Sequence, residues 1–331
     1  MTLTRTPFRI TLGGGGTDLP AYYSRFGGFV FAAGIDKYMF INVRRPETNN
    51  LVRVQYEKTE TVVHRDKLKH DLAREALRML GIENNIDIVS KADIPPGTGL
   101  GSSSCYAVGI LNALHAFRKE SFTPQELAEE ACRLEIDILN KPIGKQDQYM
   151  AVFGGLTVLE IEKNGKVNIR KADISKSTAE DLSKNLQVFY TNIKRDSNQI
   201  LSEQSLFIRT NKNSVVDKMH HIKEMGYNIL HAAEGGNLTD IGLLMDQHWE
   251  YKRKISSKMS NSGLDEIYEI AKENGALGGK IMGAGGGGFF VFYIERRFEE
   301  FRRILENLGL KRMDYQFDHE GTMVLDKQKK L

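Results

Sequence analysis

The chain has 331 residues, which exceeds the roughly 250–300 at which single hydrophobic cores stop growing, so its length favours two packed lobes. Its 46 basic and 43 acidic residues give a net charge of +3, too small to indicate a nucleic-acid or membrane surface as a partner. No apolar run reaches the roughly 18 residues of a membrane span, and the N-terminus lacks the apolar core of a signal peptide. We therefore expect a cytoplasmic protein with buried free thiols at Cys105 and Cys132.

The first third of the chain is rich in β-branched and aromatic residues, which favour strands. Four strands are expected there, at residues 5–12, 29–35, 38–44 and 51–56. A helix pattern follows at 66–80 and ends at Gly81. A further strand at 86–91 leads into a glycine-rich loop and a helix.

Helices dominate the middle of the chain. Residues 123–126, Thr-Pro-Gln-Glu, form a capping box with proline at the first helical position, so we expect a helix from there to about residue 139. The remaining expected elements are strands at 156–161 and 187–191, helices over most of 197–258 and at 264–274, strands at 279–282 and 289–294, a helix at 296–308 and two short strands. The basic residues 327–331 are expected to form a solvated, frayed tail.

This order of elements predicts an α+β fold, because strands and helices are grouped rather than regularly alternating. No fixed-period repeat and no Pro- or Ser-rich linker divides the chain. We expect the boundary between the two lobes to fall within 155–187, and we assign residues 1–170 to the first lobe and 171–331 to the second.

Glycines and serines crowd residues 95–104, Pro-Pro-Gly-Thr-Gly-Leu-Gly-Ser-Ser-Ser, between an expected strand and an expected helix. Glycine allows a ligand to approach the main chain, and the first turn of a helix has unpaired N–H groups and the positive end of the helix dipole. Phosphate is the usual anion at such a place, although a tight turn with a serine cap is the alternative. The expected phosphate-binding residues are Pro96, Gly97, Gly99, Leu100, Gly101, Ser102, Ser103 and Ser104.

The loop at 95–104 is not a Walker A sequence, because no lysine follows Gly101, and its glycine spacing differs from that of a dinucleotide fingerprint. Two other loops, 13–16 and 283–288, are also glycine-dense. The last formally contains G-x-G-x-x-G, but an expected strand follows it instead of a helix. Three such loops in one chain indicate that the backbone closes around a ligand.

Two acids are candidates for chemistry. Helical spacing places Glu135 on an otherwise apolar stripe, and a buried carboxylate needs a partner, a metal or a proton. An ion pair within the chain is the alternative for Glu135. Asp147 lies in a polar segment, and taken alone it is an ordinary loop acid.

Phosphoryl transfer needs a phosphate cradle, a metal held by oxygens, an acid near the acceptor hydroxyl and a cation that offsets charge. Glu135 with the hydroxyl of Ser102 or Ser103 suits Mg²⁺, which prefers oxygen ligands. Asp147 suits the acceptor of the hydroxyl proton. Two cations are candidates for keeping Asp147 ionised: Arg9 and Lys145.

Together the three loops resemble the GHMP kinase superfamily, which is named for galactokinase, homoserine kinase, mevalonate kinase and phosphomevalonate kinase. Its first motif resembles residues 7–18, its second motif, P-x-x-x-G-L-G-S-S, resembles 95–104, and its third resembles 280–288. The resemblance implies a ribosomal S5 domain 2-like first lobe, a ferredoxin-like second lobe, and ATP with Mg²⁺ as cofactors.

The resemblance also implies roles for single residues. Asp147 matches the catalytic aspartate, Glu135 the metal-binding glutamate, and the serine after Gly101 the serine on the metal side. Arg9 matches the first-motif arginine of galactokinase, and Asp18 matches an acid that binds sugar hydroxyls there.

The first loop, with Gly-Gly-Gly-Gly-Thr-Asp-Leu-Pro, and the segment 144–148, Gly-Lys-Gln-Asp-Gln, are most similar to bacterial D-glycero-D-manno-heptose 7-phosphate kinases. These enzymes phosphorylate the anomeric hydroxyl and yield the 1,7-bisphosphate, from which nucleotide-activated heptose for surface glycans such as lipopolysaccharide is made. Galactokinases carry Glu-His-Thr-Asp where this chain has Gly-Gly-Thr-Asp, which argues against galactose and leaves room for a larger or phosphorylated sugar. Fucokinase and other GHMP small-molecule kinases are the alternatives.

A small sugar phosphate is therefore the expected partner, bound by Gly14, Gly15, Thr17, Asp18, Gly285, Gly286 and Arg195. Arg195 is placed to grip the sugar phosphate bidentately, with solvated surface charge as the alternative. A binding module without catalysis is the rival class, because S5-like folds also occur in RNA-binding proteins, but the chain lacks an aromatic-basic stripe. The sequence is compatible with a homodimer and does not fix the oligomeric state.

Overall fold

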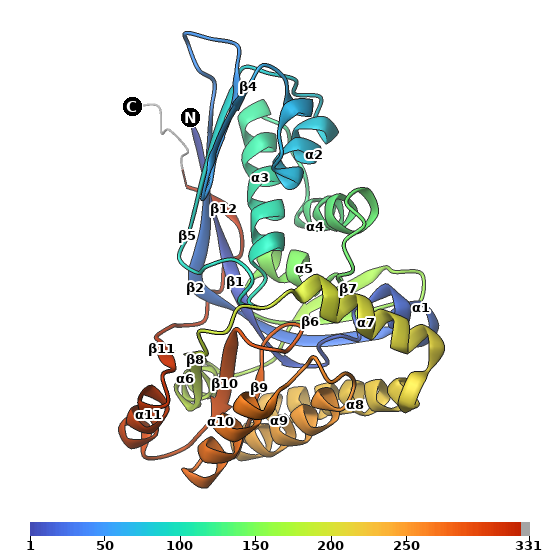
Figure 1. Ribbon diagram of the computed structural model, residues 1–331, viewed down its shortest axis with the longest axis vertical. Helices are drawn as coiled ribbons and strands as arrows, with labels where there is room; N and C mark the ends of the chain where they lie inside the picture. Colours follow the sequence, from blue (N-terminus) through green and yellow to red (C-terminus); the bar gives the residue numbers. More distant parts are fainter. Residues whose placement is uncertain (326–331) are drawn as a thin grey trace.

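The computed structural model describes residues 1–325, which fold around two β-sheets with helices packed against them (Figure 1). The α+β class expected from the sequence is confirmed. The basic tail at 327–331 lies outside the described residues. None of the helices within 1–325 combines the length and the apolar character that a bilayer crossing requires.

The first sheet has eight strands, in the order β12-β1-β2-β5-β3-β4, with β6 added beside β2 and β7 beside β6. Its pairs are antiparallel except β3 with β5, which is parallel. The strands are β1 (Thr2–Gly13), β2 (Gly28–Arg44), β3 (Val52–Gln55), β4 (Thr59–Val62), β5 (Ile86–Ala92), β6 (Leu156–Ile161), β7 (Val167–Lys171) and β12 (Met323–Val324).

The long strand β2 replaces the two strands expected at 29–35 and 38–44. Its pairing with β1 shifts register between Pro7 and Phe8, because Tyr38 faces Pro7 while Ile35 faces Phe8. The two extra residues between Ile35 and Tyr38 form a bulge, so the polar interruption bends the strand without ending it. The N-terminal half of β2 pairs with β6 and its C-terminal half with β5, which makes β2 the spine of the sheet.

Helix α3 (Ser102–Arg118) packs against β1 and β2 and is the central helix of the first lobe. It is buried along most of its length, from Ser104 to Leu114, which is why its sequence is apolar on more than one side. Around it lie η1 (Arg65–Lys67), α2 (Asp71–Met79), α4 (Pro124–Cys132), the π-helical segment η2 (Arg133–Ile138) and α5 (Gln146–Phe153). The single helix expected from residue 123 to 139 therefore changes to a π-helix at Arg133, and π-helical turns often lie at functional sites.

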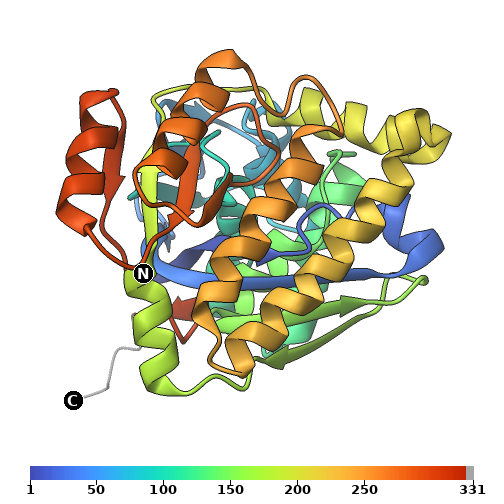
Figure 2. The same ribbon diagram turned by 90° about the horizontal axis from the view of Figure 1, so that it is seen from below.

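The second sheet has four antiparallel strands in the order β11-β8-β10-β9. Helices α8 and α9 pack against each other, α8 also contacts β1 and β2, and α9 contacts β9, so this pair joins the two sheets (Figure 2). The elements are α1 (Pro20–Phe26), α6 (Lys176–Asn185), β8 (Leu186–Tyr190), α7 (Ser197–Thr210), η3 (Lys212–Ser214), α8 (Val215–Glu234), α9 (Leu238–Arg253), α10 (Ser262–Glu273), β9 (Gly278–Ile281), β10 (Phe289–Tyr293), α11 (Phe298–Asn307) and β11 (Lys311–Met313).

Five elements are absent from the sequence-based expectation: α1, α5, α6, β4 and β7. Each has 10 residues or fewer, which is too short for hydrophobic periodicity to give a clear signal. The expected helix at 66–80 is also divided, because η1 precedes α2 and His70 caps the start of α2.

The proposed boundary at 170/171 falls inside β7, which belongs to the first sheet. The chain also returns to this sheet after β11, where β12 pairs with β1. The division of the chain into 1–170 and 171–331 stays a prediction. Its single cut does not separate the two sheets, because residues from the C-terminal end complete the first sheet.

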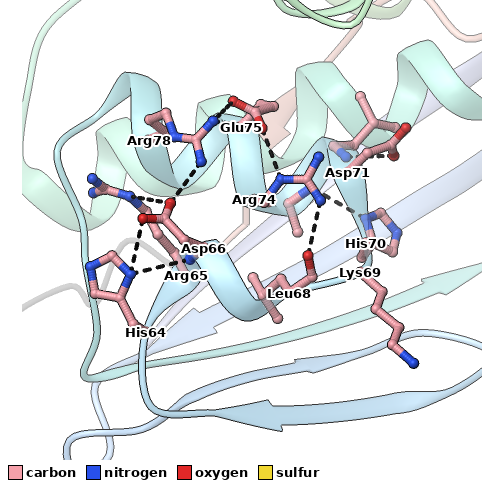
Figure 3. Close-up of polar contacts among 12 residues, drawn as sticks. His64, Arg65, Asp66, Leu68, Lys69, His70, Asp71, Arg74, Glu75 and Arg78 are labelled. Atoms are coloured by element: carbon pink, nitrogen blue, oxygen red, sulfur yellow. Dashed lines mark hydrogen bonds and ion pairs between the residues drawn. The ribbon is translucent and has the colours of Figure 1, made fainter.

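Ion pairs hold the short helix η1 against α2 (Figure 3). Arg78 contacts both Asp66 of η1 and Glu75 of its own helix, each at 2.7 Å. Arg74 also contacts Glu75 and donates to the Leu68 carbonyl at 2.9 Å. The buried carboxylate of Glu75 is thus neutralised by two arginines, and the cluster fixes the edge of the first lobe beside α3.

His115 predicts a pH dependence of stability. Its ring lies between Glu130, 2.6 Å from Nε2, and Glu120, 2.8 Å from Nδ1. The hydrogen bond to Glu130, helped by Glu120, raises the pKa of His115 against the opposing effect of burial. A raised histidine pKa stabilises the fold fully below its unfolded value of about 6.5, and this contribution is lost as the pH rises through the folded pKa.

We therefore expect His115→Asn to be less stable than wild type by about 1–2 kcal/mol near pH 5.5, with a smaller difference near pH 9. Urea unfolding at both pH values measures this. His319→Asn, at an exposed histidine, is the control and should show no such change. A stability difference for His115→Asn that is the same at both pH values would contradict the assignment.

Candidate active site

A cavity of about 250 Å³ lies where the three glycine loops meet. Each loop contributes to its lining, together with the first turns of α5 and α7 and the end of α9. The side chains and glycines that matter most for the argument are Asp18, Gly99, Ser103, Asp147, Arg195 and Gly283. The three sequence motifs are thus brought together around one space.

The loop before α3 presents its backbone to this cavity. Gly97, Gly99 and Gly101 all have positive φ, and Gly101 caps α3 in the left-handed conformation. Gly97, Gly99 and the stretch Gly101–Ser104 line the cavity, so the N–H groups of the first turn of α3, which lack partners within the helix, lie at the cavity wall and suit an anion there. Two predicted residues do not line it: Pro96 is exposed on the outside, and Leu100 is buried, with its carbonyl accepting from Arg9 N.

Alanine substitutions at Gly97 and Gly99 distinguish two costs of an added Cβ: the strain of a positive φ, and a steric clash with a neighbouring atom. A Cβ built at Gly99 would lie 2.5 Å from the Met282 carbonyl oxygen, whereas at Gly97 the nearest atom is 3.9 Å away. Both positions need positive φ, which costs alanine about 1 kcal/mol. We expect Gly97→Ala to bind ATP with at most a few-fold loss, and Gly99→Ala to lose about 10²-fold because the loop must move. Calorimetric titration with a non-hydrolysable ATP analogue measures this, and equal losses would contradict the close packing.

Asp147 lies in the first turn of α5. Its local sequence had predicted a loop position. Arg9 holds its Oδ1 with Nε at 2.8 Å and Nη2 at 2.6 Å, and Arg9 Nη1 also donates to the Gly99 carbonyl at 2.8 Å. Arg9 is almost fully buried, while a quarter of the Asp147 side chain is exposed to the cavity. Within residues 1–325 nothing donates a hydrogen bond to Asp147 Oδ2, so this oxygen is available to a ligand.

The placement of Lys145 requires a correction. Its ammonium donates to both carboxylate oxygens of Glu129, at 3.0 and 2.8 Å, and to the Gly165 carbonyl at 2.8 Å. The side chain lines a different surface pocket from Asp147. Lys145 therefore ties α5 to α4 and to the turn after β6, and Arg9 is the cation that pairs with Asp147.

Glu135 is fully buried on the π-helical segment η2. Its Oε2 accepts from Ser104 at 2.6 Å and from Gln148 at 2.8 Å. Its Oε1 accepts from Ser103 Oγ at 2.5 Å and from Lys141 Nζ at 3.2 Å. The ion pair considered as the alternative is thus present, and its partner is Lys141.

The same atoms fit a bound cation. Lys141 Nζ is 2.8 Å from Ser103 Oγ as well as 3.2 Å from Glu135 Oε1, so two oxygens already converge on a positive charge. An alcohol and a carboxylate are suitable Mg²⁺ ligands, and Mg²⁺ usually takes few protein groups and completes its shell with phosphates and water. Among the residues described, no cluster of three or more His, Cys, Asp or Glu side chains could hold a metal ion. The hydroxyl of Ser102 donates instead to the Pro95 carbonyl at 3.5 Å, and its role as a metal ligand stays a prediction.

Asp18 lines the same cavity as Asp147 and lies close enough for the two charges to interact. It accepts from Gly16 N and Gln146 N, both at 3.1 Å, and from Gln146 Nε2 at 3.2 Å. Burial, with a contribution from the charge of Asp147, raises the pKa of Asp18. Gly144 makes this position possible, because a Cβ there would lie 2.0 Å from Asp18 Oδ2. Asp18 is thus a buried carboxylate of the cavity, and its contact with a sugar stays a prediction.

Other residues expected to bind substrate support the loops instead. Thr17 is buried, and its hydroxyl donates within the loop to carbonyls of Gly14 and Phe29. Gly14 is needed because a Cβ there would lie 2.1 Å from the Phe29 oxygen. Neither residue lines the cavity, whereas Gly15 does.

The third loop also divides its glycines between two roles. Gly283 and Ala284 line the cavity, but Gly285 and Gly286 do not. The Gly285 carbonyl accepts from the Arg195 guanidinium, and Gly286 N donates to the Met259 carbonyl at 2.7 Å. Gly285 therefore holds Arg195, and Gly286 ties the loop to Met259, while a contact of either glycine with the substrate stays a prediction.

Sequence reasoning missed two cations of the cavity, Lys141 and Lys252. Lys252 is buried at the end of α9, and its Nζ donates to the Gly283 carbonyl at 2.5 Å. Burial, then the charges of Arg195 and Arg9, lowers the pKa of Lys252 to about 7. A signal was present in the sequence, because Lys252 continues the buried stripe of Ile241 and Met245, just as Glu135 continues the stripe of its own helix.

Comparison with known families agrees with this geometry. Residues 67–155 match the GHMP kinases N terminal domain, and residues 229–311 match the GHMP kinases C terminal domain, together more than half of the chain. The chain belongs to the GHMP kinase family. The sequence-based identification is thus confirmed, and this GHMP kinase brings its three glycine loops together with Asp147 and Ser103 around one cavity.

Individual relatives resemble the GHMP kinase over nearly its whole length. A D-glycero-alpha-D-manno-heptose 7-phosphate kinase of Campylobacter jejuni is 28% identical and covers 96% of this chain and 97% of its own. An L-fucokinase/L-fucose-1-P guanylyltransferase of Bacteroides fragilis is 26% identical over 86% of this chain but only 34% of its own length. A crystal structure of a D-glycero-D-manno-heptose 1-phosphate kinase from Bacteroides thetaiotaomicron has a TM-score of 0.81 at 23% identity, covering 98% of this chain and 99% of its own, and shows the shared fold.

Proposed function

We propose that this GHMP kinase transfers the terminal phosphoryl group of ATP to the anomeric hydroxyl of D-glycero-D-manno-heptose 7-phosphate and yields the 1,7-bisphosphate. Such a product would feed nucleotide-activated heptose and surface glycan synthesis in the cytoplasm, where ATP is available. The observation that carries the proposal is the Asp147 carboxylate, which Arg9 holds through one oxygen only, in the cavity that Asp18 and the phosphate loop also line. The similarity to the Campylobacter heptose 7-phosphate kinase supports this acceptor.

Residues 97–104 and the start of α3 would hold the phosphates of ATP, because backbone N–H groups and the helix dipole favour negative charge there. Glu135 and Ser103 would hold Mg²⁺ with the phosphate oxygens. When bound, Mg²⁺ neutralises charge that develops on the transferred group. Lys141, which contacts both residues, is close enough to place a second positive charge beside the phosphates.

Asp147 acts on the acceptor. Its free Oδ2 would accept the hydrogen bond of the anomeric hydroxyl and take the proton as the hydroxyl oxygen bonds to the terminal phosphorus. The bond from that phosphorus to the bridging oxygen breaks, and ADP leaves with the electron pair. Arg9 keeps Asp147 oriented and offsets its charge, while Asp18 would position the neighbouring sugar hydroxyls.

A substrate panel tests the acceptor. Purified protein, Mg²⁺ and ATP are mixed with heptose 7-phosphate, heptose, fucose, galactose or mevalonate, and ADP release is followed by a coupled assay. We expect the highest kcat/KM with heptose 7-phosphate and a product phosphorylated at the anomeric position by NMR. A preference for fucose would favour the fucokinase alternative, which the Bacteroides relative supports. No ADP release with any sugar would reject a sugar kinase.

A further inference from the structure

The cations around the cavity fall into two groups. Arg9 is paired with Asp147, and Lys141 with Glu135. Arg195 and Lys252 also line the cavity, but neither has a carboxylate within salt-bridge distance in the part of the chain from 1 to 325. The wall that these two residues form therefore carries positive charge that the described protein does not neutralise.

Both side chains are held in place by backbone carbonyls. Arg195 donates to the carbonyls of Gly285 and Met282, and Lys252 donates to those of Gly283 and Ile281. Carbonyl dipoles orient a cation but compensate for its lost hydration only in part. Burial accordingly lowers the pKa of Arg195 to about 10 and that of Lys252 to about 7. Two fixed and under-neutralised cations suit an anion of charge −2.

Lys252 reaches the cavity from the end of α9, and the Gly283 carbonyl that holds it belongs to the third loop. The nucleotide side is formed by residues 97–104 with Lys141, and Arg195 touches it, since a Cβ at Gly99 would lie 2.4 Å from Arg195 Nη2. Lys252 lies on α9, and the acid whose charge acts on it is Asp18 of the first loop. Arg195 thus lies beside the phosphate loop. Lys252, whose hydrogen bonds go to Ile281 and Gly283 and not to residues 97–104, is assigned to the wall that would face the acceptor.

On the basis of the proposed function, we infer that Lys252 is the residue with which this enzyme recognises the phosphate group that its acceptor already carries, together with Arg195. The amine, fixed on the Gly283 carbonyl, would donate to that phosphate and select phosphorylated acceptors over neutral sugars. It is a specificity residue, because it would contact the phosphate that the acceptor already carries and not the transferred phosphoryl group.

The test compares Lys252→Met with wild type on two acceptors, heptose 7-phosphate and heptose without phosphate. We expect KM for heptose 7-phosphate to rise by about 30-fold or more, with KM for heptose and for ATP unchanged within about threefold. Lys252→Arg keeps the charge and should recover part of the loss. Lys254→Met removes an exposed lysine two residues along the chain and is the matched control. Equal losses on both acceptors, or a raised KM for ATP, would overturn the inference.

A second measurement does not depend on the identity of the sugar. Inorganic phosphate is titrated into protein that is saturated with Mg²⁺ and a non-hydrolysable ATP analogue, and binding is measured by calorimetry. The analogue fills the sites for the nucleotide phosphates beforehand. We expect binding by wild type and Lys254→Met, and about tenfold weaker binding by Lys252→Met. If wild type phosphorylates neither heptose 7-phosphate nor heptose but binds phosphate in this way, the proposed acceptor is wrong and the inferred anion site at Lys252 is supported. If the loaded wild type binds no phosphate, the inference is wrong even where heptose 7-phosphate is turned over. Lys252→Gln replaces the methionine variant if that protein does not fold.

Discussion

Replacing Asp147 with Asn is expected to lower kcat by about 10³-fold while the Kd for ATP changes by no more than about twofold. Asparagine has the shape of aspartate, and its amide oxygen can still accept from Arg9, so the start of α5 should keep its position. It cannot take a proton or carry the charge that Oδ2 presents to the acceptor. Steady-state ADP release gives kcat, and calorimetric titration with an ATP analogue gives Kd.

Asp137→Asn is the control for this experiment, because Asp137 is an exposed acid on the same lobe and does not line the cavity. Its kcat should match that of wild type. Turnover by Asp147→Asn close to the wild-type rate would remove this carboxylate from the chemistry. A large loss of ATP affinity would instead show that Asp147 shapes the nucleotide site.

Glu135→Gln is expected to have the second largest effect, with kcat at saturating ATP about 10²-fold lower and a much higher Mg²⁺ requirement. The substitution removes the carboxylate charge from the point where Ser103 and Lys141 also converge. It also replaces an acceptor by an amide that must face donors from Ser104 or Gln148, so we expect a loss of about 1–3 kcal/mol in the free energy of unfolding. Activity against Mg²⁺ concentration and urea unfolding measure the two effects separately.

Gln148→Leu serves as a comparison, because it disturbs the buried hydrogen bonds of Glu135 without removing its charge. We expect it to lose stability by a similar amount but to keep the wild-type dependence on Mg²⁺. If Glu135→Gln lost stability alone and showed an unchanged Mg²⁺ dependence, Glu135 would be a structural anchor for Lys141, and the metal would have to be held elsewhere.

The sequence was sufficient to predict the parts of the site that depend on the main chain or on helical spacing. The three glycine loops predicted a ligand enclosed by backbone, and they do meet at one cavity. The helical stripe predicted that Glu135 is buried, which the structure confirms. Such features are local, because positive φ and the period of a helix are properties of a few neighbouring residues.

Features that depend on distant contacts were not predictable in this way. Arg9 and Asp147 are 138 positions apart, and local sequence gave no reason to prefer Arg9 over the neighbouring Lys145. Within the glycine loops, Gly14 supports the fold while Gly15 lines the cavity, and the difference arises from the approach of Phe29 in another strand. Which of two similar residues faces a ligand is decided by tertiary packing and not by residue type.

The return of the chain to β1 through β12 has a consequence for how the enzyme opens. Polypeptide links the two sheets twice, once after β7 and once before β12. Two connections, together with the α8–α9 pair that packs against both sheets, restrict rotation of one sheet against the other, so exit of the products is expected to follow a single hinge axis. Stiffening either connection, for instance with proline, would then slow exchange at the cavity mouth and leave the phosphorylation step itself intact.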